Sequence, residues 1–157
     1  MKWSEWFEKW SMTSLKVNVG VLKMNWEPKD DDKNAAWELY IELLTRVTTQ
    51  SLPKDSGDEE KALDSIHQIF PLTREVIKRN GRGSVSFTRI AIIVLNQVIR
   101  PFTAKWHKEL LNDSFKDENK CKEFRSDLFK LQPELIKYSK MLADMAGVED
   151  MTALEEK

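Results

Sequence analysis

The sequence contains little of the chemistry on which secreted proteins, metalloproteins and β-rich folds depend. Among 157 residues there are one cysteine, Cys121, two histidines, five glycines and five prolines. A single thiol forms no internal disulfide, which is typical of a reducing compartment. Two histidines and one cysteine give no cluster with zinc spacing, and so few glycines and prolines disfavour a loop-rich β architecture. We therefore expect a cytoplasmic protein without a metal or a cofactor.

Long hydrophobic runs and a charge excess of one sign are also missing. The longest purely apolar run, 90–95, is too short to span a bilayer. The first residues contain acids and tryptophans where a signal peptide needs a basic and then an apolar stretch. The formal net charge is −1, so the whole chain has no general attraction to nucleic acid or anionic lipid. A membrane is therefore not an expected partner.

Apolar residues recur at helical spacing through most of the chain. The acids at 30–32 predict a helix start, because they stabilise the free N–H groups of a first turn. Further helices are expected around 63–77, over 84–112 and over 117–146. Four long amphipathic helices with short connections predict an all-α fold, an antiparallel four-helix bundle.

Several residues predict where these helices bend, where they end and which faces are buried. Pro71 and Pro101 are expected to bend or end their helices, whereas the apolar register continues across Pro133 and predicts one bent helix there. Asn80-Gly81 and Gly147 predict helix ends, and Ser56 with Glu59 predicts a capping box. The first half of 84–112 is apolar nearly all round and is expected to be the most enclosed helix. The inner face of the helix after 30–32 is expected to carry Ala36, Trp37, Tyr40, Leu43, Leu44 and Val47.

The N-terminal region has a different pattern. Trp3, Trp6, Phe7 and Trp10 form one aromatic stripe at helical spacing, and apolar residues then alternate with polar ones and Gly20 from Leu15 to Val21. The alternation predicts one extended segment that pairs within this chain or with another molecule. The expected divisions are a Trp-rich helix over 1–12, an extended segment over 13–28, the helical bundle over 29–147 and an acidic tail over 148–157.

Charge is distributed unevenly along the chain. Residues 71–108 contain eight lysines or arginines and one acid, whereas residues 27–64 contain eleven acids and five bases. The glycine-rich turn 80–83, which leads into a helix, is suited to binding an oxyanion. The alternative is that the acidic and basic segments face each other or solvent. The candidate anion-binding residues are Arg74, Lys78, Arg79, Arg82 and Arg89.

Arg100 and His107 form the most specific pair in the sequence. A spacing of seven residues places both on one helix face, roughly 10 Å apart along the axis. An arginine that holds a phosphate and a histidine that moves a proton are the two roles needed for metal-free RNA cleavage. The spacing resembles the Arg-x(4–6)-His motif of HEPN ribonucleases, which are also helical bundles of this size. The family usually has a polar residue after the arginine, where this chain has Pro101.

The function that these patterns favour is a non-enzymatic interaction or regulatory module in a homo- or hetero-oligomeric assembly. The candidate partner-binding residues are Trp3, Trp6, Phe7 and Trp10, although the stripe could instead pack on the bundle of the same chain. Two alternatives remain open. One is a metal-independent HEPN-like ribonuclease that uses Arg100 and His107, and the other is binding of a nucleotide or nucleic-acid backbone through the basic region 74–108.

Overall fold

The computed structural model describes residues 1–46, 48, 50, 52 and 58–154, and most of these residues are helical. Within them no β-strand forms, and the only strand-like pairing is an isolated antiparallel bridge between Lys2 and Asn25. The all-α prediction is confirmed. The α-helices are α1 Trp3–Lys9, α2 Val19–Leu22, α3 Asp30–Leu44, α4 Glu59–His67, α5 Ile69–Asn80, α6 Val85–Val94, α7 Arg100–Leu111 and α8 Glu118–Ala146. Short 3₁₀ turns lie at Gly81–Ser84 (η1) and Ser114–Lys116 (η3), and a π-helical turn lies at Leu95–Ile99 (η2).

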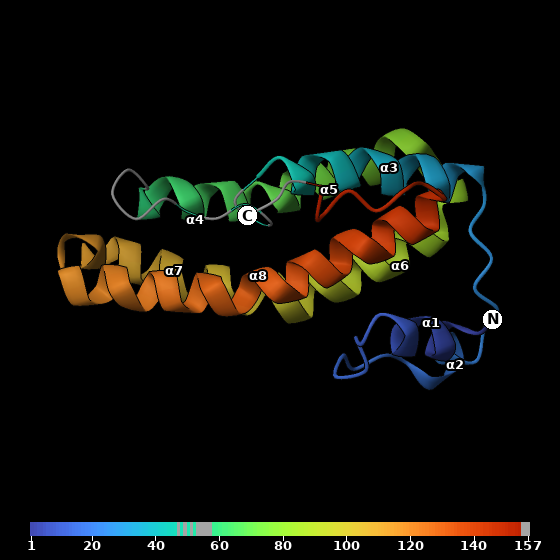
Figure 1. Ribbon diagram of the computed structural model, residues 1–157, viewed down its shortest axis with the longest axis horizontal. Coiled ribbons are helices and arrows are strands. Elements are labelled where there is room, and N and C mark those ends of the chain that lie inside the picture. The colour runs from blue at the N-terminus through green and yellow to red at the C-terminus, as the bar shows by residue number, and fades with distance from the viewer. Residues whose placement is uncertain (47, 49, 51, 53–57, 155–157) are drawn as a thin grey trace.

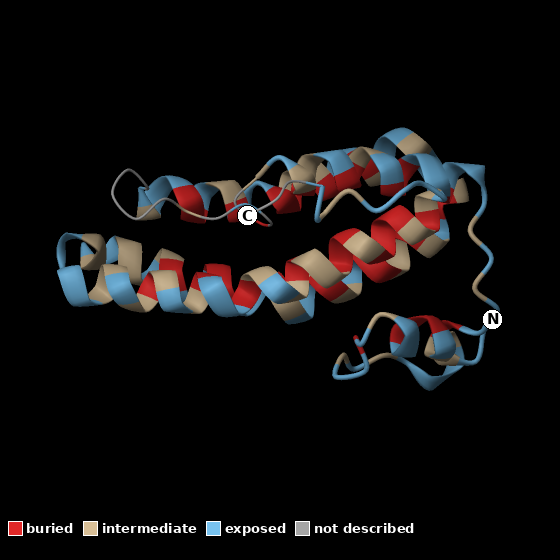
Figure 2. Ribbon diagram, viewed as in Figure 1, coloured by how far each residue is buried: buried red, intermediate tan, exposed pale blue. Residues whose placement is uncertain are grey.

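The long helices lie side by side along one axis of an elongated molecule (Figure 1). Helix α3 contacts α5, α6 and α8, while α4 contacts α7, so that the segment before η1 faces the segment after it. The small unit of α1 and α2 lies at one end. Figure 2 shows buried residues along the inner sides of the long helices and on α1. A single hydrophobic core therefore extends from Trp3 to Met145.

Helix starts and stops follow local signals in the sequence. Helix α3 begins at Asp30, and the buried Asp32 accepts a hydrogen bond from the N–H of Lys29 at 2.8 Å. Gly81 adopts φ 74° at the end of α5, and Gly147 adopts φ 71° at the end of α8. Positive φ is costly for residues with a Cβ atom, which explains glycine at both positions.

The three helix prolines behave differently. The helix is interrupted at Gln68, which lies between α4 and α5 and precedes Pro71. Pro101 is the second residue of α7 and directly follows the π-helical turn η2. Proline has no N–H to donate to a carbonyl one turn earlier, which accounts for irregular backbone at both places. Helix α8 continues through Pro133, as the apolar register predicted.

The predicted extended segment over 13–28 is wrong in part. Leu15 to Asn18 do alternate between half-buried and exposed positions, but Val19–Leu22 form the short helix α2. The Asn18 side chain accepts a hydrogen bond from the N–H of Gly20 at 2.8 Å and so starts a helical turn. The pairing that exists is within the chain, because Trp3 N–H donates to the Met24 carbonyl.

Two expectations about buried faces are also wrong. Trp37 was expected on the inner face of α3 but is 42% exposed, whereas Leu39, which was not in the expected set, is fully buried. The first half of the helix after η1 is not enclosed, since Ile92 is 49% exposed and Val85 is 47% exposed. Val47 and the predicted capping box at Ser56 lie outside the described residues; the described N-cap of α4 is Asp58, whose side chain accepts from two backbone N–H groups.

The helical stretch Glu59–Leu111 contains an 18-residue window that is long and apolar enough to cross a membrane by composition alone. Core helices meet the same criterion, and a third of this window is buried. The described residues after α8 lie against α3, where the N–H of Met151 donates to the Tyr40 hydroxyl at 2.6 Å.

Candidate functional site

Basic side chains from α4, α5 and α7 meet around one small cavity. Its volume is about 270 Å³, and no acid is among its described lining residues. The two arginines and two histidines come from either side of the η1 turn. The lining residues are His67, Phe70, Arg74, Arg100, Thr103, Ala104 and His107. We refer to this cavity as the basic pocket.

The histidines of the basic pocket contact each other. The rings of His67 and His107 lie edge to face with centroids 4.7 Å apart, and His67 also lies 5.8 Å from the ring of Phe70. Nε2 of His107 is buried and has no hydrogen-bond partner among the described residues. Burial and the neighbouring His67 lower the pKa of His107, while Asp64 opposes the shift. His107 is therefore largely neutral at pH 7 and has a free ring nitrogen.

The arginines of the basic pocket retain their charge without an acidic partner. The guanidinium of Arg100 lies 4.8 Å from the centre of the Phe70 ring, and its Nε donates to Asn96 Oδ1 at 3.2 Å. Neither Arg100 nor Arg74 forms an ion pair within the described part of the chain. An unneutralised arginine pair at one cavity attracts an anion, because guanidinium groups match oxyanion geometry.

The predicted pair Arg100 and His107 does share one cavity, but the predicted anion set is not brought together. Of that set, only Arg74 lines the basic pocket. Arg79 forms an ion pair with Glu38 at 3.0 Å, while Lys78 and Arg82 are exposed and Arg89 is half-buried.

The glycine-rich turn, where the sequence favoured an oxyanion, faces carboxylates of α3. Asp32 Oδ1 accepts from the N–H of Phe87 in the first turn of α6 at 2.9 Å. A Cβ atom at Gly83 would collide with the Asp31 side chain, so this carboxylate lies directly against the turn. Asp31 and Asp32 therefore lie where an external anion would have to bind at this turn. This arrangement agrees with the alternative that acidic and basic segments of the chain face each other.

An acidic cavity adjoins the basic pocket. It has a volume of about 420 Å³ and shares His107 as a lining residue. We call it the acidic pocket, and its residues are Asp58, Glu60, Lys61, Leu63, Asp64, His107 and Leu110. The position of Asp64 near His107 explains why its charge raises the pKa of that imidazole.

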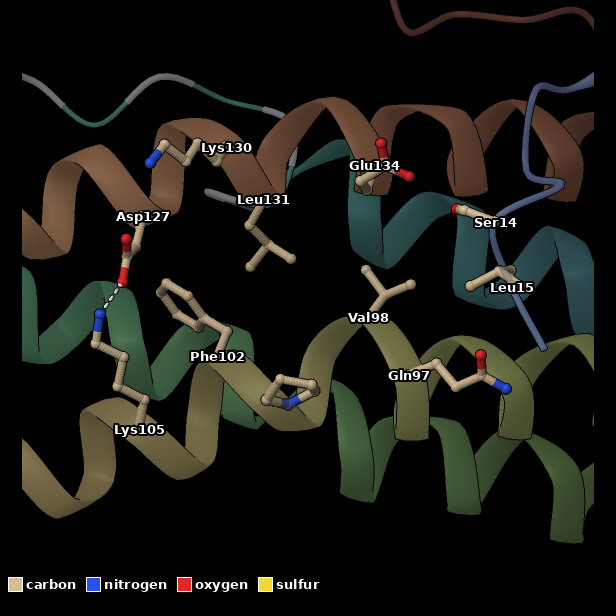
Figure 3. Close-up of a pocket in the computed structure, with 11 residues that line it drawn as sticks. Ser14, Leu15, Gln97, Val98, Phe102, Lys105, Asp127, Lys130, Leu131 and Glu134 are labelled. Atoms are coloured by element: carbon tan, nitrogen blue, oxygen red, sulfur yellow. Dashed lines mark hydrogen bonds and ion pairs between the residues drawn. The ribbon is translucent and has the colours of Figure 1, made fainter.

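A larger cavity of about 490 Å³ lies on the other side of α7, between the N-terminal segment and α8 (Figure 3). Val98, Phe102 and Leu131 point into it, and the ion pair between Lys105 and Asp127 at 2.6 Å closes one end. Gln97 fastens the N-terminal segment beside it through two hydrogen bonds to the backbone of Lys16. Because its best-placed charges neutralise each other, this cavity is a weaker anion site than the basic pocket.

The aromatic stripe of α1 packs against the rest of the same chain. Trp3 and Trp6 are fully buried and Phe7 is nearly so, whereas Trp10 is half-buried. The indole N–H groups of Trp6 and Trp10 both donate to Asp144 Oδ2, at 2.9 and 3.0 Å. The alternative of packing on the chain's own bundle accounts for these residues, and they do not form an exposed partner surface.

Cys121 shows no sign of a reactive thiol, and the acids of the described residues show no sign of a metal site. Burial is the main cause that raises the pKa of the Cys121 thiol, and its Sγ donates to the Phe115 carbonyl, so the flanking lysines do not activate it. Among the described residues no group of three or more histidines, cysteines or acids has metal-binding geometry.

The basic pocket contains one residue that sequence reasoning missed, His67. The two histidines are separated by forty positions, and only the packing of α4 against α7 brings them together. The signal in the sequence that could have brought His67 to attention was the turn at 80–84, because a turn there lets the helices before it pack against the helices after it. Comparisons with protein families, curated proteins and solved structures find no match to this chain.

Proposed function

We propose that this protein binds the phosphate group of a nucleotide or nucleic acid in the basic pocket. The observation that carries the proposal is the convergence of Arg74, Arg100, His67 and His107 on one cavity with no acid in its described lining. Arginine binds phosphate oxygens through paired N–H donors. A bound phosphate also favours protonation of His107, which then adds a further charge-assisted donor. The volume lies near the lower end of small-ligand sites, roughly 300 Å³, and leaves room for a phosphate group.

Calorimetric titration with inorganic phosphate and with AMP tests this proposal. Arg100→Gln is expected to weaken binding at least about tenfold, because it removes one charge-assisted contact. Arg82→Gln is the matched control, since Arg82 is exposed, as Arg100 is, but is absent from the lining of the basic pocket. Equal affinities in wild type and Arg100→Gln, or no binding of phosphate at all, contradict the proposal. Arg74→Gln provides an independent check that does not disturb the contact with Phe70.

Metal-independent RNA cleavage at the same pocket is a second candidate. It is favoured by the shared cavity of Arg100 and His107 and by the lowered pKa of His107, because a neutral imidazole can accept a proton from a ribose hydroxyl. The expected result is cleavage of RNA in the presence of EDTA, lost in His107→Gln with unchanged helical content. Intact RNA after prolonged incubation with wild-type protein contradicts this candidate but leaves phosphate binding standing.

An interaction module within a homo- or hetero-oligomer is a third candidate, now based on different residues. Trp37 and Ile41 are exposed on successive turns of α3 and line a groove with Leu72 of α5, and Ile92 is exposed on α6. Light scattering across a range of concentrations tests it. A defined oligomer that Trp37→Ser and Ile41→Ser dissociate supports the candidate, and a monomer at every concentration contradicts its homo-oligomeric form.

The proposed scaffold for all three candidates is an antiparallel four-helix bundle. Its members are α3, the segment α4–α5, the segment α6–α7 and α8. The support is that the chain direction along the common axis alternates between successive segments in Figure 1, and that η1 and η3 are short connections.

A further inference from the structure

We infer that the ligand of the basic pocket is a small phosphate monoester with a donor-rich organic part, such as a nucleoside 5′-monophosphate, and not an extended polynucleotide. The inference rests on the proposed phosphate binding, and it adds the acidic pocket as the site for the rest of the ligand. The phosphate occupies the basic pocket, and the organic part extends past His107 into the acidic pocket.

The two pockets adjoin at His107, which is a lining residue of both. On one side of this imidazole the cavity is lined by Arg74 and Arg100, and on the other side it is lined by acids of α4. A ligand that fills both sides must be negative at one end only. Its other end must be neutral or a hydrogen-bond donor.

The acids of the acidic pocket are available to accept hydrogen bonds. Glu60 and Asp64 lie one turn apart on α4, and neither forms an ion pair within the described residues. Asp58 uses one side-chain oxygen to cap α4, where it accepts from the N–H groups of Glu60 and Lys61. Ribose hydroxyls and base amino groups are donors of the kind that free carboxylates bind. Leu63 and Leu110 add apolar surface for the face of a base or a sugar.

The same acids disfavour a polynucleotide. A nucleic-acid strand carries one negative charge per phosphate, spaced about 3.4 Å along the helix axis of B-DNA. An internal phosphodiester in the basic pocket has a neighbouring phosphate on each side, and one of them would enter the acidic pocket. The carboxylates of the acidic pocket would repel that phosphate, because both carry negative charge. A monoester avoids this conflict because its only charged group stays between the arginines.

The test is calorimetry at pH 8 and one salt concentration with four probes: inorganic phosphate, ribose 5-phosphate, AMP and a ten-residue RNA without terminal phosphates. AMP is expected to bind at least about tenfold more tightly than inorganic phosphate, through added hydrogen bonds to carboxylates. Ribose 5-phosphate separates the sugar from the base: an affinity equal to that of AMP identifies the sugar hydroxyls as the recognised donors. The RNA is expected to bind more weakly than AMP.

Glu60→Gln with Asp64→Asn is the diagnostic variant, and Glu75→Gln, an exposed acid of α5 outside both pockets, is its control. The double variant is expected to reduce the preference for AMP over inorganic phosphate to near one while phosphate still binds. Equal wild-type affinities for AMP and phosphate overturn this inference and leave the proposed function intact. Tighter binding of the RNA, with a steep salt dependence, overturns it in favour of a polynucleotide. No binding of inorganic phosphate or any phosphate ester overturns both.

Discussion

The imidazole edge of one histidine faces the ring plane of the other in the pair His67 and His107, with ring centroids 4.7 Å apart. Protonation of both rings places two positive charges in contact, beside the charges of Arg74 and Arg100. Burial of His107, together with the neighbouring His67, is the reason that the pKa of His107 lies below its ordinary value of 6.5. The free protein therefore favours an uncharged His107, and a bound anion favours the charged form.

The lowered pKa of His107 predicts a loss of stability in mild acid. Above pH 6.5 the group is neutral in the folded and the unfolded chain and contributes nothing. As the pH falls below that value, the unfolded chain takes up a proton first, so the free energy of unfolding decreases until the pH passes the folded pKa. Urea unfolding between pH 8 and pH 5 measures this slope. His107→Gln is expected to flatten it, and an unchanged slope contradicts the assignment to His107.

Sulfate in the same titration gives a second readout, because its charge is constant over this pH range. Bound sulfate is expected to raise the pKa of His107 and to restore stability at pH 5.5 to 6.5 in the wild type. Arg100→Gln is expected to lose most of this protection. The same protection in wild type and variant would indicate a general salt effect.

Asp144 joins the first helix to the last one, and this predicts a large effect of its removal. Its Oδ2 accepts from the indoles of Trp6 and Trp10 and lies 3.2 Å from Lys9 Nζ. Asp144→Ala leaves one buried and one half-buried indole N–H without a partner, which is expected to cost roughly 2–4 kcal/mol of unfolding free energy. Chemical unfolding followed by tryptophan fluorescence measures the loss. Glu149→Ala, at an exposed position nearby, is the control and is expected to change little.

Asp32 predicts a comparable effect at the other end of α3. One carboxylate oxygen accepts from Lys29 N–H and the other from Phe87 N–H, so one buried side chain joins the starts of α3 and α6. Asp32→Ala removes both bonds and is expected to lower the unfolding free energy by about 2–4 kcal/mol. Asp30→Ala removes an exposed acid from the same first turn and is expected to cost less than about 1 kcal/mol. Similar losses in the two variants would show that Asp32 acts through the helix dipole alone.

The starts and ends of helices were predictable because their causes are local. Acids at 30–32, glycine at 81 and 147, and the uninterrupted register across Pro133 each act within one or two turns. The aromatic stripe of α1 was equally predictable from the sequence, but the residue to which its indoles donate was not. Asp144 lies 138 positions from Trp6, and nothing near either residue indicates the other.

The buried faces and the candidate site depend on packing angles that periodicity does not determine. Trp37 and Ile92 fit the apolar stripes of their helices, yet the neighbouring helices cover other positions and leave both side chains exposed. Arg100 and His107 share a cavity because seven residues span two turns of one helix. His67 and Arg74 join them only through the packing of α4 and α5 beside α7, which the periodicity of the sequence does not predict.

Two buried tyrosines make a matched pair for a last prediction. Tyr40 and Tyr138 are both almost completely buried, but only the Tyr40 hydroxyl has a partner, the N–H of Met151. The hydroxyl of Tyr138 has no hydrogen bond in the described structure, and burial raises its pKa far above the ordinary value, so the phenol stays neutral.

Replacing each tyrosine with phenylalanine is therefore expected to have opposite effects. Tyr138→Phe removes a buried hydroxyl that pays a desolvation penalty without a bond, and is expected to raise the unfolding free energy by about 1 kcal/mol. Tyr40→Phe leaves the N–H of Met151 without its acceptor and is expected to lower it by about 1 kcal/mol. Urea unfolding of both variants at pH 7.5 measures the two changes. A loss in Tyr138→Phe as large as that in Tyr40→Phe would mean that the Tyr138 hydroxyl is bonded in solution, to water within the core.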